Sequence, residues 1–599
     1  MKSRPLRRLI YKMESLWIRG PLAQMAVLLA SMILVALLGG LLMMLVHPGY
    51  RDFPQASWWA FLHMTDTGYL GADKDPIERA VAVVLTFTGV ILFVGGVIAI
   101  LTTWFDRTMA SLSSGRGSVV EEGHVLLLGS NPGLPDLIAE CASAAAQRWP
   151  EGRLPTIVVV SESPLEYRRP AAMERRQRVV LRTGPPADPA TLERADYTRA
   201  AVIILLSSRA RRGAGPSDLN VLKTLVSLRS ALPAQGPRLV LDLSYAANAR
   251  LIPSLAGTLK THVLSSLEFS GRLICQCLRY PGISRAYRQL LSDAVGQSIL
   301  LLPCDPDMVG RPLGKLRQMA RGAVVLGTIS QGQAALLHWD RILLAGDELV
   351  LLAGSLSEVT FQEAADPLPK FGNPIQAEAA PQLRILAVGW SEGLLALVSE
   401  LARYRTQAFV LTLAEKLTPE RDQALRAALA TNVELDLAPA LDASTYDRVL
   451  LLSSDHQDPA TADAETALRY AKLLGKSGRF VVELHEESNA PLFGEGNDIV
   501  ITDQVVNHWL AQISLKPAFA DLYEELFTEG GCELRLATFE ELLGTDCEVS
   551  GQAVWKDLAQ QLFRRGYLAL GAAGPELRLN PPPEWEFEFD ALTRILVLV

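Results

Sequence analysis

Seven consecutive residues carry the most distinctive chemistry of this 599-residue chain, and they are Thr65, Asp66, Thr67, Gly68, Tyr69, Leu70 and Gly71. Threonine hydroxyls, a carboxylate and the carbonyls of a glycine-bearing loop are hard oxygen ligands, which suit K⁺, Na⁺ or Ca²⁺. A selectivity filter replaces the water around an ion with such oxygens. The segment therefore predicts a loop that coordinates permeating cations.

The loop departs from the potassium filter pattern T-T-V-G-Y-G at two informative positions. Asp66 stands where the second threonine would be, and Leu70 stands where the last glycine would be. Leucine resists the positive φ that glycine accepts, so a full stack of carbonyl sites is not expected. A ring of Asp66 carboxylates would instead concentrate cations by fixed charge. In the alternative interpretation, Asp66 turns behind the filter and hydrogen-bonds the pore helix.

Two apolar runs flank this loop and predict a pair of membrane spans. Residues 22–46 carry no charge and, at about 1.5 Å per residue, reach roughly 37 Å, which is enough to cross a bilayer core. Residues 80–103 form a second run of this kind. Residues 54–71 between them read as a short re-entrant helix followed by the filter. This is the layout of a P-loop cation channel, and two spans per chain require several subunits around one pore.

Charges beside the apolar runs predict the orientation. The arm 1–21 carries six Lys and Arg residues and one acid, whereas the loop between the spans carries more acids than bases. By the positive-inside rule, both termini are cytoplasmic and the loop faces outward. Gly89, Gly95 and Gly96 interrupt the inner span and are candidate gating hinges. Close packing of helices on small residues is the alternative.

The chain beyond a Ser- and Gly-rich linker, residues 108–122, predicts a duplicated α/β unit. Buried-type strands alternate with helices, which is typical of a parallel, doubly wound sheet. The turn bearing Gly129 and Gly133 has a counterpart in Gly389 and Gly393 at the same spacing. Two copies of one domain, joined by the Pro-rich linker 357–382, are the simplest interpretation.

A weak nucleotide site is predicted at the first turn, with Gly129, Asn131, Gly133 and Glu162 as its residues. Asn131 replaces the second glycine of a dinucleotide fingerprint, and that glycine normally lets the pyrophosphate approach. Glu162 follows the next strand, where an acid would bind a ribose. The alternative is an empty turn and a solvated carboxylate.

A second weak prediction concerns a regulatory Ca²⁺ site. Carboxylates gather at Glu483, Glu486, Glu487, Glu495 and Asp498, although such clusters are often solvated loops. The six cysteines and eight histidines show no zinc spacing, and no catalytic motif is present, so we expect no enzyme. A net charge of −8 argues against nucleic-acid binding.

These features resemble the Castor/Pollux family of cation channels, which are similar to potassium channels with regulatory (RCK) domains. The resemblance covers essentially the whole chain. It rests on Asp66-x-Gly68, on residues 182–186 and 200–206, most strongly on residues 271–277, and on Gly389-Trp390 and residues 524–527. The chain departs from plant members at Tyr69-Leu70, where their filter has Asn-His.

The resemblance implies the architecture and assembly of the protein. The expected fold is an α-helical pore domain, residues 22–107, followed by two Rossmann-like RCK domains, each with a small α+β C-terminal lobe. The expected boundaries within the first RCK domain, 123–356, are 123–262, 263–295 and 296–356, and those within the second, 383–599, are 383–502, 503–530 and 531–599. A homotetramer with a cytosolic gating ring follows, without a covalent cofactor. The compact chain suggests the plasma (inner) membrane.

Four functional hypotheses follow from these observations. The leading one is a ligand-gated cation channel, non-selective or Ca²⁺-permeable, opened by Ca²⁺ or a nucleotide. A K⁺-selective RCK channel is the second. The third is a membrane-anchored, nucleotide-sensing subunit of a transporter. A membrane-bound NAD oxidoreductase is the fourth, and the incomplete glycine fingerprint argues against it.

Overall fold

The computed structural model falls into two compact units, residues 1–117 and 118–599. It describes residues 21–66, 68, 75–113, 115, 117–131, 133–148, 152–164, 176–207, 217–233, 235–290, 296–363, 370–373, 381–437, 443–454, 458–474, 479–494, 496–527, 531–544, 550–574 and 576–599.

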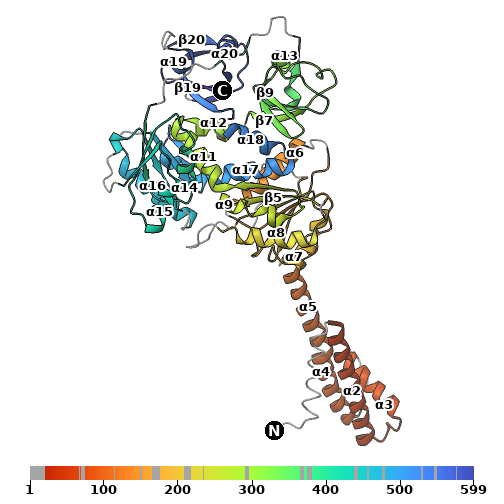
Figure 1. Cartoon of the computed structure of the whole chain (residues 1–599). Coiled ribbons are helices and arrows are strands. Elements are labelled where there is room, and N and C mark those ends of the chain that lie inside the picture. Colours follow the sequence, from red (N-terminus) through yellow and green to blue (C-terminus); the bar gives the residue numbers. More distant parts are fainter. Residues whose placement is uncertain are drawn as a thin grey trace. The chain divides into compact units, whose positions relative to one another are not determined.

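The first unit consists of two long apolar helices with a short helix between them (Figure 1). α2 (Pro21–Val46) is followed by α3 (Phe53–Thr65), and then α4 (Pro76–Gly89) continues through a π-helical segment, η2 (Val90–Gly95), into α5 (Gly96–Ser113). Leu22–Val46 and Pro76–Asp106 are long and apolar enough to cross a membrane, judged by length and composition. Their many exposed Leu, Val, Ile and Phe side chains are typical of a surface that faces lipid or other subunits.

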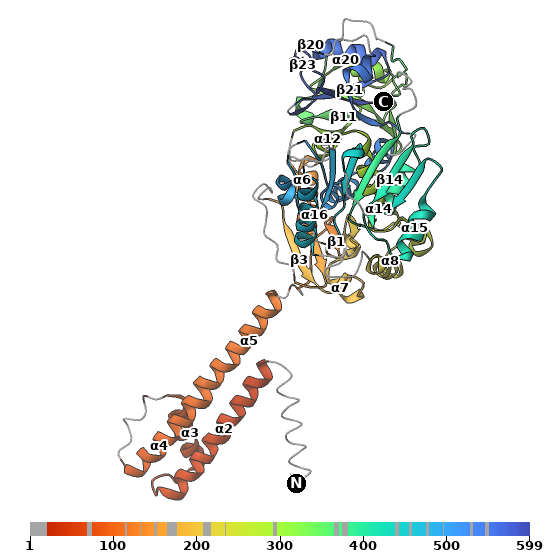
Figure 2. The same cartoon turned by 90° about the vertical axis from the view of Figure 1, so that its left-hand side faces the viewer.

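The second unit contains two parallel six-stranded sheets with identical topology (Figure 2). The first sheet has the order β3-β2-β1-β4-β5-β6, with β1 (Val125–Leu128), β2 (Ile157–Ser161), β3 (Val179–Thr183), β4 (Val202–Leu205), β5 (Arg238–Leu243) and β6 (Thr261–Ser265). The second has the order β15-β14-β13-β16-β17-β18, with β13 (Leu383–Val388), β14 (Phe409–Leu413), β15 (Val433–Leu437), β16 (Arg448–Leu451), β17 (Arg479–Leu484) and β18 (Asp498–Ile501). This is the doubly wound dinucleotide-fold order, which confirms the predicted duplication.

Helices connect the strands of each sheet. Around the first sheet these are α6 (Leu134–Arg148), α7 (Pro189–Arg194), η3 (Tyr197–Arg199), α8 (Leu219–Ala231), α9 (Ala246–Ala249) and α10 (Ile252–Ala256). Around the second they are α14 (Gly393–Leu401), α15 (Pro419–Ala428), η5 (Ala443–Thr445), α16 (Pro459–Leu473) and η6 (Glu487–Phe493). Each Rossmann-like lobe is followed by two further helices, α11 (Ser266–Arg279) and α12 (Ile283–Leu290), and α17 (Thr502–Leu515) and α18 (Phe519–Phe527).

Each half ends in a small antiparallel lobe, as the predicted fold class requires. The first lobe contains β7 (Ser298–Pro303), α13 (Leu313–Met319), β8 (Ala320–Arg321), β9 (Ala323–Ser330), β10 (Gln333–Leu336), β11 (Glu348–Ala353), η4 (Leu356–Glu358) and β12 (Thr360–Phe361). The second contains β19 (Leu534–Thr538), α19 (Phe539–Leu543), β20 (Gly551–Val554), α20 (Trp555–Arg564), β21 (Leu568–Ala573), β22 (Leu577–Leu579), β23 (Glu586–Phe589) and β24 (Arg594–Leu598). Their main sheets have the orders β10-β9-β11-β7 and β19-β24-β21-β22.

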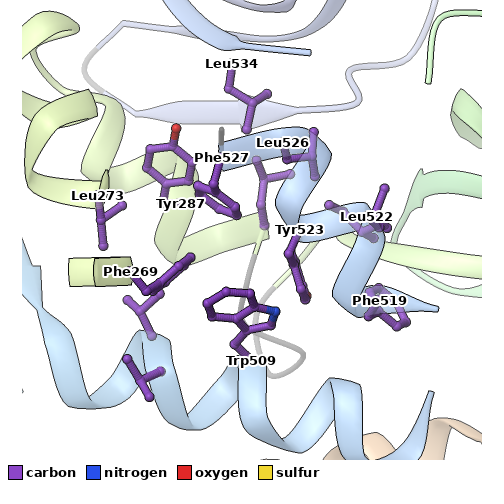
Figure 3. Packing of buried hydrophobic residues seen from close by; sticks show 14 of the residues in the cluster. Phe269, Leu273, Tyr287, Trp509, Phe519, Leu522, Tyr523, Leu526, Phe527 and Leu534 are labelled. Carbon is purple, nitrogen blue, oxygen red and sulfur yellow. The ribbon is translucent and has the colours of Figure 1, made fainter. Parts of the chain in front are cut away.

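The two halves are joined by an exchange of crossover helices, in which a helix of each half packs on the other half. α11 of the first half packs on α14 of the second, and α17 of the second packs on α6 of the first. Where the two exchanged helices begin, the Ser270 and Thr502 hydroxyls lie 2.9 Å apart. An aromatic core fills the space between the exchanged helices (Figure 3), where Phe269 and Trp509 have ring centroids 4.2 Å apart. One buried core therefore spans both halves.

Gly271 sets how closely α11 approaches α14. A Cβ atom at this position would lie 2.7 Å from the carbonyl carbon of Ala396 and from the nitrogen of Leu397. Both are backbone atoms, so the two helices would have to separate to accommodate a larger side chain.

Gly271→Val is therefore expected to lower the free energy of unfolding by about 1–3 kcal/mol, the usual cost of overpacking. Urea unfolding of the purified full-length protein, followed by tryptophan fluorescence, measures this. Gly574→Val is the matched control, because a Cβ atom there meets nothing within 4 Å. Equal stability of the two variants would contradict close packing at Gly271.

Candidate functional site: the loop between two apolar helices and the predicted ligand residues

The short helix α3 begins and ends at residues whose types favour a helix boundary. Asp52 precedes the helix in an extended conformation, and proline occupies its first turn, where no backbone donor is needed. At the other end, Asp66 leaves the helical conformation at φ −130° while its N–H still donates to the Leu62 carbonyl over 2.8 Å. The Thr65 hydroxyl donates to the Phe61 carbonyl over 3.0 Å. The predicted filter segment therefore starts directly at the carboxyl end of a helix, whose partial negative charge favours cations.

The Asp66 side chain bends over the backbone of the residues that follow it. Its Oδ1 accepts the N–H of Gly68 over 2.8 Å, and the side chain is exposed in the single subunit. The expected alternative, a hydrogen bond back to the pore helix, is not formed by this carboxylate within the described part of the chain. Thr67, Tyr69, Leu70 and Gly71 lie outside the described residues.

Packing against both long helices holds α3 in place. A Cβ atom at Gly40 of α2 would lie 2.6 Å from the Ser57 backbone, so glycine permits a very close approach there. On the other side, the Thr86 hydroxyl of α4 donates to the His63 carbonyl over 3.0 Å. His63 itself is buried, and its Nδ1 lies 2.9 Å from the Trp59 carbonyl oxygen. The short helix α3 is thus held in place by both α2 and α4.

The three hinge candidates have different surroundings. A Cβ atom at Gly89 would overlap the backbone of Met64, and one at Gly96 would lie 2.8 Å from the Leu28 side chain. Gly95 instead has open space, with the nearest atom, the Val90 carbonyl oxygen, at 3.9 Å. Close packing therefore explains Gly89 and Gly96, while Gly95 ends the π-helical segment η2. π-Helical turns are frequent at functional sites, and the sequence pattern did not signal this one.

Sequence reasoning also missed a charged group beside the loop. His47 at the end of α2 places Nε2 4.0 Å from Asp75 Oδ2 and 3.9 Å from Glu78 Oε1. Asp75 in addition caps α4, because its Oδ1 accepts the Ile77 N–H over 2.8 Å. These residues join the ends of the two spans on the side of the filter.

The first glycine-rich turn is covered by a helix of the second half. Gly129 has a φ of +110°, as a strand-to-helix turn of this kind requires. The side-chain amide of Asn507 on α17 donates to the Gly133 carbonyl over 2.7 Å. A Cβ atom at Gly133 would also lie 3.3 Å from Asp503 Cβ. The absence of a side chain at Gly133 therefore lets α17 pack closely against this turn. The predicted role of Gly133 in nucleotide binding stays a prediction.

The remaining predicted nucleotide residues lie along the same edge of the sheet. Asn131 is buried beside Gly129, and Glu162 is exposed at the end of β2, the neighbour of β1. The Glu162 carboxylate lies 3.5 Å from Asn220 Nδ2. Burial, together with the charges of Glu487 and Glu140, raises the pKa of Asp136 at the start of α6. The surroundings of this turn are acidic, which disfavours a pyrophosphate.

The described carboxylates of the predicted calcium cluster are divided among β17, η6 and β18. The Asp498 oxygens accept the backbone N–H groups of Gly282 and Ser284 over 2.6 and 3.0 Å, so this carboxylate caps α12. Burial raises the pKa of Asp498, although these hydrogen bonds oppose the rise. Glu483 is buried on β17, Glu486 and Glu487 begin η6, and Glu495 lies outside the described residues. No three His, Cys, Asp or Glu side chains of the described segments gather as a metal site.

Comparison with known proteins gives ion channels as relatives. The chain is 26% identical to the ion channel CASTOR of Lotus japonicus over 64% of its length. It is 22% identical to the probable ion channels CASTOR and POLLUX of Oryza sativa over 91% and 99% of its length. It spans 45% to 67% of the length of these relatives. No family model matches the chain.

Among solved structures, the human SLO3 gating ring has a TM-score of 0.56 at 13% identity and covers 80% of this chain. The likeness confirms the fold of tandem RCK domains for the second unit. The GsuK channel bound to NAD covers 96% of the chain with a TM-score of 0.38.

The surroundings of the glycines generate a prediction. Gly89→Ala places a methyl group on the Met64 backbone and is expected to detach the pore helix, so the yield of folded protein in detergent falls several-fold. Gly95→Ala has room for its methyl group and is expected to fold normally. Size-exclusion profiles of the two variants measure this, and equal recovery of both would contradict the packing role of Gly89.

Proposed function

We propose that this chain is one subunit of a homotetrameric, ligand-gated cation channel. The observation that carries the proposal is the re-entrant helix α3, which lies between two membrane-length helices and delivers Asp66 and Gly68 at its carboxyl end. Two spans cannot enclose a pore, so identical subunits would ring it. The names of the curated relatives and the gating-ring fold of the second unit support the same function.

In the proposed arrangement the chain crosses the plasma membrane twice, with both termini in the cytoplasm. Cations enter past the loop between the spans, cross the filter Thr65–Gly71 and leave between the inner helices. Four tandem RCK units form a ring whose movement acts on the inner helix, which can bend at η2 and Gly95. A ligand opens the pore to the extent that it binds the open ring more tightly, typically by about 1–3 kcal/mol.

The filter is proposed to be non-selective among monovalent cations and permeable to Ca²⁺. Asp66 is exposed and lies directly at the filter, so four copies would place four carboxylates around the pore. A K⁺-selective filter is the alternative, favoured by the Gly68-Tyr69 pair. Ca²⁺ or a nucleotide is the proposed gating ligand, bound elsewhere than at the first glycine-rich turn, which α17 covers and whose acidic surroundings disfavour a pyrophosphate.

Reversal potentials of the purified protein in a planar bilayer test the channel function. Under opposed K⁺, Na⁺ and Ca²⁺ gradients, we expect a potential near zero between K⁺ and Na⁺ together with a Ca²⁺ current. A potential at the K⁺ limit would replace the non-selective filter with a K⁺-selective one. Absence of any current would overturn the channel and favour a regulatory subunit of a transporter.

Asp66→Asn removes the proposed ring of charge and keeps the hydrogen-bond acceptor for Gly68. We expect Ca²⁺ permeability relative to K⁺ to fall at least tenfold, because neutral amides attract divalent cations far less than carboxylates do. Asp52→Asn is the matched control, since this exposed acid precedes α3 and makes no capping hydrogen bond. Unchanged relative permeability in Asp66→Asn would show that another group selects the ion.

A further inference from the structure

A cavity of about 280 Å³ lies between the two halves of the cytosolic unit. Its first wall consists of the residues after β5 and β6 and the start of α11, including Tyr245, Glu268 and Arg272. Its second wall is α14 and the residues after it, including Glu400 and Arg403. Ligands of open α/β sheets bind beyond the carboxyl ends of the strands, and the ends of β5 and β6 border this cavity.

The cavity presents two guanidinium groups with unused donors. Arg403 Nη1 lies 3.3 Å and Arg272 Nε 3.9 Å from Glu400 Oε2, and the Glu400 side chain is only 4% exposed. These are ion pairs, but neither arginine donates a hydrogen bond to any described residue. The Arg272 side chain is 15% exposed, so bulk water cannot surround it. An arginine has five N–H donors in a planar fork, the geometry that recognises a carboxylate.

Negative charge lines the same cavity. The Glu268 carboxylate makes no ion pair or hydrogen bond with the described residues, and Glu392 also lines the space. A purely anionic ligand would meet these carboxylates, and a bare cation would meet the two guanidinium groups. Leu267, Leu395 and Ala396 supply an apolar surface between the charges.

We propose that this cavity binds a small zwitterion of the α-amino-acid class. The ligand carboxylate pairs with Arg272 and Arg403, its ammonium group pairs with Glu268, and an apolar side chain lies against Leu267 and Ala396. The volume suits such a ligand, because small-molecule pockets begin near ~300 Å³ and a dinucleotide needs far more.

Binding at this place has a consequence for gating, which rests on the proposed channel function. The two walls belong to different halves, so an occupied cavity holds α14 against the start of α11. A zwitterion therefore stabilises one arrangement of the two halves over others. The binding itself does not depend on ion conduction.

Isothermal titration calorimetry of the purified full-length protein in nanodiscs tests the binding. The probes are L-valine, L-leucine and L-methionine, and two analogues of L-leucine that keep one charge each, 4-methylpentanoate and isoamylamine. We expect at least one amino acid to bind and the two single-charge analogues to bind at least tenfold more weakly. Equal binding of an analogue, or absence of binding by all three amino acids, would overturn the proposal.

Substitutions locate the site. Glu268→Gln and Arg272→Gln are each expected to weaken amino-acid binding at least tenfold, whereas the exposed controls Glu420→Gln and Arg405→Gln leave it unchanged. Arg403→Gln is a second test should Arg272→Gln unfold, because Arg403 is more exposed.

Binding of Ca²⁺ alone that disappears in Glu268→Gln, without amino-acid binding, would assign a cation site instead. Calorimetric binding without bilayer current would leave this proposal standing and overturn the channel.

Discussion

The exchange of crossover helices between the two halves is the interaction on which the second unit depends. α11 lies on α14 and α17 lies on α6, so neither half completes its core without the other. Glycine permits both contacts, at Gly271 beside Ala396 and at Gly133 beside Asn507. The same packing closes the first glycine-rich turn toward the second half and creates the charged cavity beside α14. The fold, the first glycine-rich turn and the charged cavity therefore all depend on one interface.

A buried ion-pair network strengthens this interface at the far end of α11. Arg279 pairs with Glu533, which also accepts hydrogen bonds from Tyr280 and Arg535 over 3.1 and 2.8 Å. Burial opposes ionisation of Glu533, but the two guanidinium groups outweigh it and hold the pKa of this carboxyl below its usual value. The Arg279 guanidinium also lies 3.8 Å from the centre of the Tyr404 ring. Loss of one partner would leave a buried, unpaired charge, so this network links α11 to the C-terminal lobe of the second half.

The first unit is stabilised by a different set of interactions from the second. Its helices expose apolar side chains, and hydrogen bonds and glycine contacts position α3. Gly89 and Gly40 have no side chain, so α3 can approach the backbone of α4 and α2 closely. Small residues of this kind are the usual basis of helix packing where burial of apolar surface supplies little energy. The π-helical turn after Gly89 breaks the regular pattern of the inner helix at one place and leaves Gly95 unobstructed.

The amino-acid sequence by itself determined the elements and their class. Uninterrupted apolar runs predict long apolar helices, whose backbone polar groups are satisfied within the helix. Alternating buried strands and helices predict a parallel sheet, in which neighbouring strands satisfy each other's backbone groups. The repeated turns at Gly129 and Gly389 revealed the duplication.

Tertiary structure alone decided what lies against each turn and each glycine. The sequence predicted a nucleotide-binding role for Gly133 and a hinge at Gly89, but it gave no sign that each permits a close helix contact, since a contact between residues distant in the chain leaves no local pattern. For the same reason, the sequence did not predict the cavity lined by Glu268 and Arg403, because its two walls are brought together only by the exchange of helices.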